Sequence, residues 1–179
     1  MKKEDVLRVL ISEEKLKQIC KKLGKEISRD YEGKNLLLVS VLKGAVVFLS
    51  DLLREITCDC RIDFMAVSSY NGAKSTGFVK FKKDLDISPE GCDILIVEDI
   101  LDSGVTLAYL KNILKDRNAA SIKICTLLDK PDNRKAEITP DYVGATVPDE
   151  FVVGYGLDYD EKYRNLPYIG VLSPSVYEK

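Results

Sequence analysis

The chain of 179 residues contains no histidine, and this absence removes several kinds of chemistry at once. Without an imidazole there can be no Ser-His-Asp triad and no metal bound through histidine. The sequence also lacks the Gly-x-x-x-x-Gly-Lys-Ser/Thr and Gly-x-Gly-x-x-Gly patterns, which removes the common ATPase and dinucleotide-binding interpretations. The missing residues and patterns therefore narrow the chemistry before any motif is considered.

Long apolar runs are missing as well. No run approaches the roughly 20 residues that a membrane-spanning helix needs, and the first five residues lack the apolar core of a signal peptide. The five cysteines have no zinc-site spacing, and a formal net charge of −2 gives no general electrostatic reason to bind nucleic acid or an anionic membrane. We therefore expect a single cytoplasmic domain over residues 1–179, with no nucleic-acid or membrane partner.

A strand followed by acidic residues is the most informative feature that is present. The run from Ile94 to Val97 is short, apolar and rich in β-branched residues, which predicts a strand buried on both faces. Glu98 and Asp99 end this run, and Asp102 follows shortly afterwards. Carboxylates suit sugar hydroxyls or a divalent cation, so a polar site is expected at the end of this strand.

Small hydroxyl and glycine residues come next, before a helix. Ser103, Gly104 and Thr106 suit a tight turn, and the apolar spacing from Leu107 onward is helical. The N-terminus of a helix offers unpaired N–H groups and the positive end of a dipole, both of which favour a phosphate. A phosphate cradle beside acidic residues indicates a phosphorylated sugar. The functionless alternative is a buried strand followed by a polar helix cap.

The residues from Val97 to Thr106 resemble the phosphoribosyl-pyrophosphate motif of type I phosphoribosyltransferases. The resemblance implies that the 5′-phosphate is held by Ser103, Gly104, Val105 and Thr106. Some members of the family have a lysine at the position of Val105, so phosphate binding here would depend on N–H groups and hydroxyls.

A second motif follows the apolar run from Leu36 to Val41. Leu42, Lys43 and Gly44 stand at the turn into another segment of helical spacing, and a lysine at such a turn is most often simply solvated. These three residues resemble the pyrophosphate-binding loop of 6-oxopurine phosphoribosyltransferases. The resemblance implies that the Leu42–Lys43 peptide bond is cis and that the loop directs backbone N–H groups at pyrophosphate.

The carboxyl-terminal part of the chain resembles the region that reads the base in this family. Lys130 follows a predicted apolar strand, and a lysine at this place in the family contacts the exocyclic oxygen of the purine. Phe151 begins a segment that is locally a strand with glycine bends and an acidic end. By resemblance, Phe151 stacks on the purine and the Val152 backbone faces its Watson–Crick edge. Asp158 would lie near magnesium, and Arg164 near pyrophosphate.

Residues 61–68 alternate in polarity, with Ile62 on one side and Asp63 on the other, which predicts a strand with one face less buried. Ser69 and Tyr70 then open a polar, glycine-containing loop, whose simplest interpretation is a surface hairpin. The resemblance makes this loop, at about residues 69–80, a mobile lid in which Ser69 and Tyr70 fold over the site to exclude water. A returning strand is expected from Phe78 to Leu85.

Strands that alternate with helices, each ending in a functional loop, predict an α/β fold with sites at the carboxyl edge of the sheet. We expect a mostly parallel twisted sheet flanked by helices, which is the type I phosphoribosyltransferase fold. The segments from Arg61 to Leu85 would form an antiparallel flap, and the chain ends a small hood over the base. The family is commonly dimeric or tetrameric, so a homodimer or homotetramer is expected.

The resemblance implies an enzyme of purine salvage that transfers 5-phosphoribose from phosphoribosyl pyrophosphate to N9 of hypoxanthine or guanine. Its products would be IMP or GMP and pyrophosphate. Glu98 and Asp99 would hold the ribose hydroxyls, and Asp102 would accept the N7 proton of the purine as general base. Magnesium (Mg²⁺) near Glu98, Asp99 and Asp158 would neutralise the charge on the departing pyrophosphate.

Two alternatives stay open at this point. One is a regulator that keeps the phosphoribosyl-pyrophosphate motif but binds nucleic acid, and it predicts a basic face that the slight excess of acidic residues does not favour. The other is an enzyme of the same fold that acts on xanthine, adenine or uracil. Lys130 and the segment beginning with Phe151 favour a 6-oxopurine, which disfavours adenine and uracil, whereas the choice among hypoxanthine, guanine and xanthine stays open.

Overall fold

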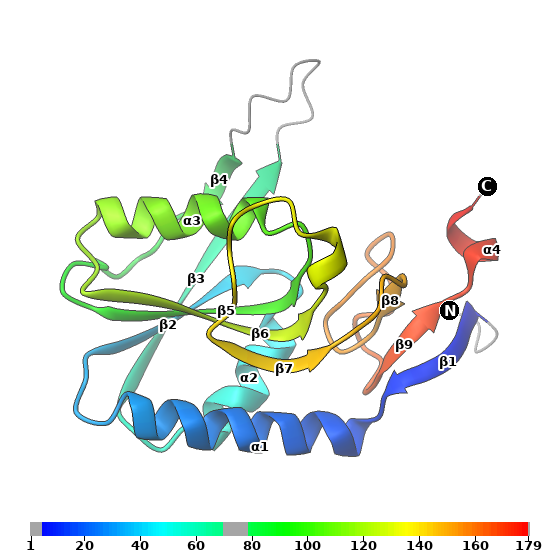
Figure 1. Cartoon of the computed structure of the whole chain (residues 1–179), viewed down its shortest axis with the longest axis horizontal. Coiled ribbons are helices and arrows are strands. Elements are labelled where there is room, and N and C mark those ends of the chain that lie inside the picture. Colours follow the sequence, from blue (N-terminus) through cyan, green and yellow to red (C-terminus); the bar gives the residue numbers. More distant parts are fainter. Residues whose placement is uncertain (1–4, 70–78, 179) are drawn as a thin grey trace.

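The computed structural model describes residues 5–69 and 79–178, and within them the chain forms a large sheet, a small sheet and flanking helices (Figure 1). The elements follow in the order β1 (Val6–Ile11), α1 (Glu13–Asp30), β2 (Leu36–Leu42), α2 (Val46–Glu55), β3 (Cys60–Ser69), β4 (Val79–Lys83), β5 (Asp93–Leu101), α3 (Val105–Asp116), β6 (Ser121–Asp129), the 3₁₀ turn η2 (Pro131–Asn133), β7 (Tyr142–Thr146), β8 (Val152–Val153), β9 (Ile169–Leu172) and α4 (Pro174–Tyr177). The predicted α/β class is confirmed.

The large sheet has six strands in the order β4-β3-β2-β5-β6-β7. β2 runs parallel to β3 and to β5, with Leu38 beside Ile62 on one side and Leu95 on the other. β5 and β6 are also parallel, as are β6 and β7, whereas β4 runs antiparallel to β3. The sheet is therefore mostly parallel, as predicted, and the carboxyl ends of β2, β5 and β6 lie at one edge.

Helices cover both faces of this sheet: α1 and α2 lie on one face and α3 on the other (Figure 1). The side chains of β2 alternate between the two layers. Leu36 and Leu38 belong to the apolar cluster that contains the α1 and α2 side chains, while Leu37 and Val39 belong to the cluster that contains those of α3. Burial on both faces explains why the central strands are continuous apolar runs rather than alternating ones.

The first helix begins and packs as its sequence predicts. The Lys15 N–H donates to Oγ of Ser12, the N-cap residue, at 3.3 Å, and Glu13 and Glu14 stand in the first turn. One face of α1 is buried against α2 and the sheet. No helix in the described parts of the chain is both long and apolar enough to cross a membrane.

The two ends of the chain meet in a separate antiparallel sheet of order β1-β9-β8. Val9 on β1 pairs with Gly170 on β9, and Val171 on β9 pairs with Val152 on β8. This small sheet lies beyond the carboxyl ends of the parallel strands (Figure 1). The two chain ends thus lie together in one small sheet, while their role as a hood over a bound base stays a prediction.

The antiparallel arrangement predicted for the segments from Arg61 to Leu85 is confirmed, since β3 and β4 run antiparallel. β3 also pairs in parallel with β2, so it belongs to the large sheet as well. One face of β3 is less buried, as predicted, but it is the face that carries Ile62, which is 40% exposed. Asp63 and Met65 on the opposite face are buried. Apolar alternation alone does not identify the buried face, because Asp63 finds polar partners inside.

The buried Asp63 carboxylate anchors the segment that follows β4. Its Oδ1 accepts the N–H of Phe64 at 2.7 Å, and its Oδ2 accepts those of Asp86 and Ile87, both at 2.8 Å. Burial alone would raise the pKa of Asp63, but these three donors, with Lys83 nearby, hold the pKa below its usual value. A carboxylate whose pKa is lowered in the folded state stabilises that state above the ordinary aspartate pKa and loses this effect as the pH falls.

We expect Asp63→Asn to lower the free energy of unfolding at pH 7 by about 1–3 kcal/mol, because an amide presents N–H groups where the carboxylate accepts bonds from the backbone. Urea unfolding of the variant, with exposed Asp59→Asn as the matched control, measures the effect. The difference between Asp63→Asn and the wild-type protein should shrink below about pH 4 as the wild-type carboxylate becomes protonated. A loss equal to that of Asp59→Asn would contradict the anchoring role.

Candidate functional site

The predicted functional segments meet at the carboxyl edge of the large sheet. The predicted pyrophosphate loop begins at the last residue of β2, the predicted phosphate loop runs from the end of β5 into the first turn of α3, and Lys130 follows β6 directly. The base-binding segment starts at Phe151, after β7, where the chain enters the small sheet. Because the carboxyl ends of parallel strands share one edge, residues more than a hundred positions apart come together there.

A pocket of about 200 Å³ lies in the turn between β5 and α3. It is lined by Glu98, Ile100, Leu101, Asp102, Ser103, Gly104, Thr106 and Leu107. The turn requires glycine at position 104, where φ is +76°, and a Cβ there would also overlap Ile138. Val105 is the first residue of α3; its side chain is 44% exposed and is not part of the lining. The predicted phosphate-binding residues other than Val105 thus share one pocket.

A second pocket of about 170 Å³ lies between this turn and the small sheet. Its lining brings together Ile100, Asp102, Lys130, Phe151, Val152, Leu157 and Asp158. Five of these seven residues were predicted site residues from four different places in the chain. Ile100 and Asp102 line both pockets, so the two pockets adjoin at Asp102.

Asp102 itself is placed as a proton acceptor would need to be. Its Oδ1 is buried and has no hydrogen-bond partner among the residues that the structure describes. A buried carboxylate oxygen without a partner is costly unless a ligand completes it. Because Asp102 stands where the two pockets adjoin, a molecule that fills the second pocket would contact it.

Lys130 is buried, with 6% of its surface exposed, and two acceptors hold its ammonium group. Nζ donates to the carbonyl oxygen of Glu150 at 2.6 Å and lies 3.5 Å from Oδ1 of Asp149. An ammonium has three donors and no acceptor, so one N–H stays available for the second pocket. Lys130 also ties β6 to the residue before Phe151, which fixes one wall of that pocket.

Phe151 presents an aromatic face at the second pocket. Its ring is stacked on Tyr177 of α4, with centroids 4.9 Å apart, and meets the edge of Tyr159 at 5.6 Å. The side chain is nevertheless 39% exposed, so part of the ring remains free for a planar ligand. The neighbouring Val152 is buried and paired with Val171 in the small sheet.

The predicted acidic pair stands inside β5 rather than after it, because the strand continues to Leu101. Successive residues of a strand point to opposite faces, so Glu98 and Asp99 face different neighbours. Glu98 lines the pocket between β5 and α3, whereas Asp99 lies against Gly44, where an added Cβ would overlap the Asp99 carboxylate. The prediction that the strand ends at the carboxylates is wrong. Because both residues lie within the strand, the two carboxyl groups have different surroundings.

Asp99 and Oε2 of Glu98 are buried, and burial raises the pKa values of both carboxyl groups. Burial, with the nearby charge of Asp99, raises the pKa of Glu98 well above its usual range. Burial also raises the pKa of Asp99 to about 6, although the N–H of Ile100 donates to its carboxylate at 2.8 Å and Arg164 opposes the rise. Oε2 of Glu98 has no hydrogen-bond partner in the described parts of the chain. Buried acidic groups with raised pKa values and free oxygens are typical of ligand sites.

The predicted pyrophosphate loop has the expected backbone and lies beside Asp99. The Leu42–Lys43 peptide bond is cis, as the resemblance implied. Gly44 separates the Asp99 carboxylate from Gly156, since a Cβ on Gly156 would overlap the Gly44 carbonyl oxygen. The Lys43 side chain points outward and forms an ion pair with Glu161 at 2.9 Å, both side chains being largely exposed. Gly44 therefore lies directly against the Asp99 carboxylate.

Asp158 and Arg164 form an ion pair at 2.8 Å on the same side as Asp99. Arg164 also donates to the carbonyl oxygen of Gly156 at 2.7 Å, and its Nε is buried without a partner among the described residues. Asp99 and Asp158 are close enough for each charge to disfavour the other, since Asp158 raises the pKa of Asp99. The carboxylate oxygens of this group are the ligand type that magnesium prefers.

No group of three acidic, cysteine or histidine side chains in the described ranges is arranged to hold a metal by itself. This arrangement fits magnesium that binds together with a phosphorylated substrate, because Mg²⁺ usually takes one or two carboxylates and fills its remaining positions with phosphate oxygens and water. Glu98 lines the pocket between β5 and α3, whereas Asp158 pairs with Arg164 and does not line that pocket. The three predicted metal-binding carboxylates therefore do not form one protein-only centre.

The predicted lid residues are only partly described. Ser69 is the last residue of β3 in the structure, and Tyr70 and the loop that follows lie outside the described residues. The lid interpretation therefore stays a prediction.

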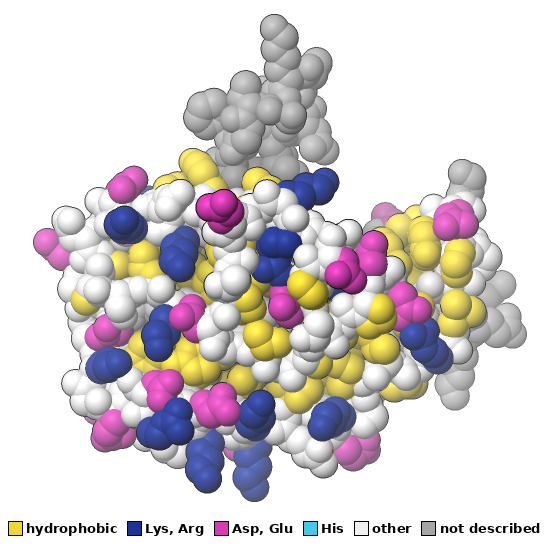
Figure 2. Space-filling model, in the orientation of Figure 1, with side chains coloured by type: hydrophobic (Ala, Val, Ile, Leu, Met, Phe, Trp, Pro, Cys, Tyr) yellow, Lys and Arg dark blue, Asp and Glu magenta, His cyan; other side chains and the backbone are white. Residues whose placement is uncertain are grey.

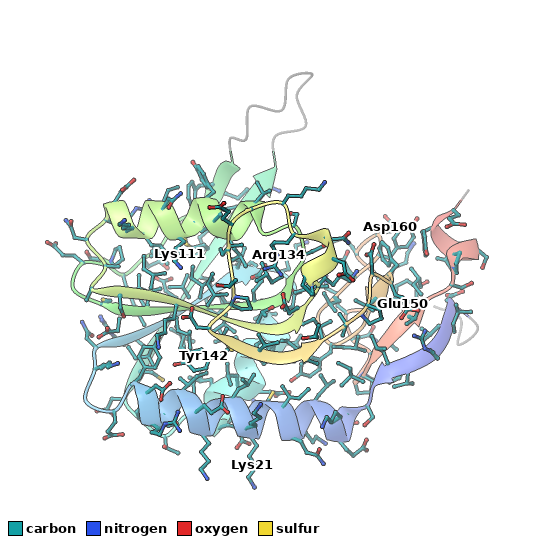
Figure 3. The ribbon with its side chains drawn as sticks, viewed as in Figure 1. Lys21, Lys111, Arg134, Tyr142, Glu150 and Asp160 are labelled. Atoms are coloured by element: carbon teal, nitrogen blue, oxygen red, sulfur yellow. The ribbon has the colours of Figure 1, made fainter. Side chains whose placement is uncertain are left out.

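Two residues behind the site were missed in the sequence. Arg134, in the loop between β6 and β7 (Figure 3), donates through Nε to the carbonyl oxygen of Asp102 at 2.9 Å and pairs with Asp129. Ile138 packs against Gly104 from the same loop. The sequence offers only a weak signal for Arg134, which is one basic residue in a charged stretch four positions after Lys130.

The chain was compared with known proteins at the level of sequence and of structure. The family model for the phosphoribosyl transferase domain matches residues 10–160. The hypoxanthine-guanine phosphoribosyltransferase of Bacillus subtilis (strain 168) is 58% identical over 179 residues, which cover 99% of each chain. The bifunctional protein TilS/HprT of Listeria monocytogenes serotype 4b (strain F2365) is 56% identical over 98% of this chain, which spans only 27% of that relative's length.

Solved structures agree with the sequence relatives. The crystal structure of a hypoxanthine phosphoribosyltransferase from Staphylococcus aureus, in a tetragonal space group, superposes with a TM-score of 0.95 at 53% identity. The match covers 98% of this chain and 96% of the crystallised one. The family model, the high identity over nearly the whole chain and the shared fold lead to one conclusion: the chain belongs to the phosphoribosyl transferase family.

Proposed function

We propose that this chain is a hypoxanthine-guanine phosphoribosyltransferase of purine salvage. It transfers 5-phosphoribose from phosphoribosyl pyrophosphate to N9 of hypoxanthine or guanine and releases IMP or GMP with pyrophosphate. The observation that carries this proposal is the position of Asp102, which lines the pocket of Ser103, Gly104 and Thr106 on one side and a pocket with Lys130 and Phe151 on the other. The relatives named as hypoxanthine-guanine phosphoribosyltransferases support the same choice of base.

The phosphate loop binds the 5′-phosphate of the sugar. The hydroxyls of Ser103 and Thr106 and the N–H groups at the start of α3 donate to the phosphate oxygens. The Glu98 carboxyl group, in the same pocket, accepts hydrogen bonds from the ribose hydroxyls and fixes the ring. Asp99 contacts the sugar from the side of the pyrophosphate loop, beside Gly44. The anomeric carbon is thereby held between the two pockets.

The base binds in the second pocket, between the Phe151 ring and the turn after β5. The free N–H of Lys130 donates to the exocyclic oxygen at position 6 of the purine. N9 then forms a bond to the anomeric carbon while the C–O bond to pyrophosphate breaks, and the electron pair of that bond leaves with pyrophosphate. The N7 proton of the purine passes to the Asp102 carboxylate, so that the nucleotide forms without a charge on the base.

The leaving group needs its negative charge balanced. The backbone of residues 42–44, the side chain of Arg164 and the positive end of α2 act on the pyrophosphate oxygens. Asp99, Asp158 and Glu98 are the residues that would hold or orient magnesium with the substrate. When bound, magnesium would neutralise part of the negative charge that develops on the departing pyrophosphate.

A panel of bases tests this function. Purified protein is supplied with phosphoribosyl pyrophosphate, magnesium and, in turn, hypoxanthine, guanine, xanthine, adenine and uracil, and kcat/KM is measured from nucleotide formation. The proposal predicts the highest values with hypoxanthine and guanine. Nucleotide formation mainly from xanthine, adenine or uracil would favour an enzyme of the same fold with another base.

A regulator that binds nucleic acid is the second alternative, and the surface gives it little support. On the face shown in Figure 2, lysine and arginine side chains are interspersed with aspartate and glutamate rather than gathered in one basic patch. Nucleic-acid binding depends chiefly on such a basic surface. Absence of any nucleotide product together with tight, salt-dependent binding of nucleic acid would favour the regulator.

The oligomeric state and location complete the proposal. A homodimer or homotetramer and a cytoplasmic location are expected of a salvage enzyme in this family. Sedimentation of the purified protein measures the first, and a sharp monomer peak at micromolar concentration would contradict it.

Glu98 and Asp99 should contribute to substrate binding through the ribose hydroxyls of phosphoribosyl pyrophosphate. We expect Glu98→Gln combined with Asp99→Asn to lower the affinity for phosphoribosyl pyrophosphate by roughly 10²-fold or more, since each lost charged acceptor contributes about 1.5–3 kcal/mol. The affinity for free hypoxanthine should change little. Equilibrium binding of both ligands measures this. The apoprotein should not lose stability, because two enclosed carboxyl groups become neutral amides of the same shape. An equal loss for both ligands would indicate collapse of the loop instead.

A further inference from the structure

The back of the phosphate loop is held by one guanidinium group, that of Arg134. Nε donates to the carbonyl oxygen of Asp102 at 2.9 Å, and the two terminal nitrogens donate to the carbonyl oxygens of Ile138 at 2.7 Å and Leu101 at 3.2 Å. The same group pairs with the carboxylate of Asp129, and both side chains are 15% exposed. A planar guanidinium with five donors can satisfy acceptors in several directions, which an ammonium cannot.

The backbone beside Arg134 extends this contact to the next peptide group. The N–H groups of Lys135 and Ala136 both donate to the carbonyl oxygen of Ser103, at 2.9 and 3.1 Å. The N–H of Lys130 donates to the carbonyl oxygen of Leu101 at 3.0 Å. The carbonyl oxygens of residues 101, 102 and 103 are therefore all turned toward the loop that joins β6 to β7 and held there.

This arrangement decides where the following N–H groups point. In a trans peptide the N–H is directed opposite to the carbonyl of the same unit. The N–H groups of Asp102, Ser103 and Gly104 therefore point away from Arg134, and no acceptor for them exists among the described residues. These three residues line the phosphate pocket. Successive N–H groups on one side of a turn form a concavity that binds anions.

We infer that Arg134 is a positioning residue: it holds the carbonyl side of the loop so that three consecutive N–H groups and the Asp102 side chain face the substrate. This inference rests on the proposed function for the identity of the ligand, a sugar 5-phosphate. Arg134 does not touch the substrate, because its donors are occupied on the far side of the loop. The tight packing of Gly104 against Arg134 and Ile138 leaves the loop little room to turn over.

A positioning role for Arg134 predicts different results from a role in fold stability alone. A stabilising ion pair would, when weakened, lower the melting temperature and the active fraction without changing affinity for either substrate. A positioning residue changes the affinity for the phosphorylated ligand and leaves that for the free base unchanged. The quantity that decides is therefore the affinity for ribose 5-phosphate and for phosphoribosyl pyrophosphate, measured beside that for hypoxanthine.

The test uses Arg134→Lys, which keeps the positive charge opposite Asp129 but cannot reach all the carbonyl oxygens. The matched control is Arg117→Lys, since Arg117 forms a two-bond ion pair with Asp84, at 2.7 Å for each bond, on the far end of α3. We expect the Kd for ribose 5-phosphate by calorimetry, and the KM for phosphoribosyl pyrophosphate, to rise roughly 10- to 100-fold in Arg134→Lys, as for the loss of one or two bonds to a charged ligand. The KM of Arg134→Lys for hypoxanthine should stay within about threefold of the wild-type value. In Arg117→Lys the Kd for ribose 5-phosphate and both KM values should also stay within about threefold.

The other possible results of this experiment also support or overturn the positioning role of Arg134. A folded Arg134→Lys with wild-type affinity for ribose 5-phosphate overturns the inference, even if its melting temperature falls. If Arg134→Lys does not fold, Asp129→Asn takes its place: it loosens the guanidinium, so weaker ribose 5-phosphate binding supports the inference and unchanged binding overturns it. A wild-type protein that forms no nucleotide refutes the proposed function, while ribose 5-phosphate binding still tests Arg134 separately.

Discussion

Asp102→Asn should lower kcat for IMP formation by roughly 10²–10⁴, the usual effect of losing a general base. Asp102 lines both the phosphate pocket and the base pocket, and its Oδ1 is buried without a partner in the described parts of the chain. An amide of the same shape can still occupy that place but cannot accept the N7 proton. Pre-steady-state measurement of nucleotide formation gives the rate of the chemical step directly.

Binding controls keep this prediction specific. Phosphoribosyl pyrophosphate should bind Asp102→Asn nearly as well as the wild-type protein, because Ser103, Thr106 and the loop N–H groups remain. The exposed Asp132→Asn, from the neighbouring turn η2, is a matched change of charge and should leave kcat unchanged. Near-normal turnover in Asp102→Asn would mean that this residue only shapes the loop.

Lys130→Ala should lose most activity on hypoxanthine and narrow the gap between hypoxanthine and adenine. The Lys130 ammonium donates hydrogen bonds and accepts none, so it complements the oxygen at position 6 of hypoxanthine and opposes the amino group of adenine. A buried donor left unpaired by the wrong base costs about 1–3 kcal/mol, and polar sites of this kind reject wrong bases strongly. Adenine should accordingly be a very poor substrate for the wild-type protein.

The ratio of kcat/KM for hypoxanthine and adenine measures this effect in both proteins. Using the ratio removes any general loss, which matters because Lys130 also holds the Glu150 carbonyl at 2.6 Å. Lys123→Ala is the matched control: it lies on the same strand, β6, with its ammonium 5.5 Å from the Tyr142 ring centroid rather than near the pocket. An unchanged ratio in Lys130→Ala would remove the main chemical support for a 6-oxopurine substrate.

The sequence was most informative where local patterns and backbone chemistry agree. The run before Glu98 predicted a buried central strand, and β5 is flanked by β2 and β6 with helices on both faces. The turn with Ser103 and Gly104 predicted a helix start, and α3 begins at Val105. These features depend on nearest neighbours along the chain, so a single sequence is sufficient to predict them.

Features that depend on distant partners were less predictable. β5 continues past Glu98 and Asp99 to Leu101 because β6 beside it offers backbone partners as far as Asp129. The buried face of β3 carries Asp63, whose carboxylate is satisfied by N–H groups of residues 86 and 87. Local polarity suggests exposure for all of these carboxylates, and only the tertiary fold supplies the donors or neighbours that permit burial.

The role of Arg134 lies even further from the sequence. Its acceptors are carbonyl oxygens of Leu101, Asp102 and Ile138, and carbonyl groups are the same in every residue. No pattern of side chains in the sequence can therefore predict this contact. The meeting of the two chain ends was expected only from the family resemblance, because the pairing of β1 with β9 joins segments more than 150 residues apart and no local pattern indicates it.

The most direct test of the central claim follows the phosphorus atoms of the reaction. Phosphoribosyl pyrophosphate, hypoxanthine and magnesium are mixed with the protein, and IMP and pyrophosphate are quantified over time by ³¹P NMR. The account predicts that both appear in equal amounts, at a rate that falls by roughly 10²-fold or more in Asp102→Asn. Release of pyrophosphate without IMP, or IMP formation that Asp102→Asn leaves intact, would contradict it.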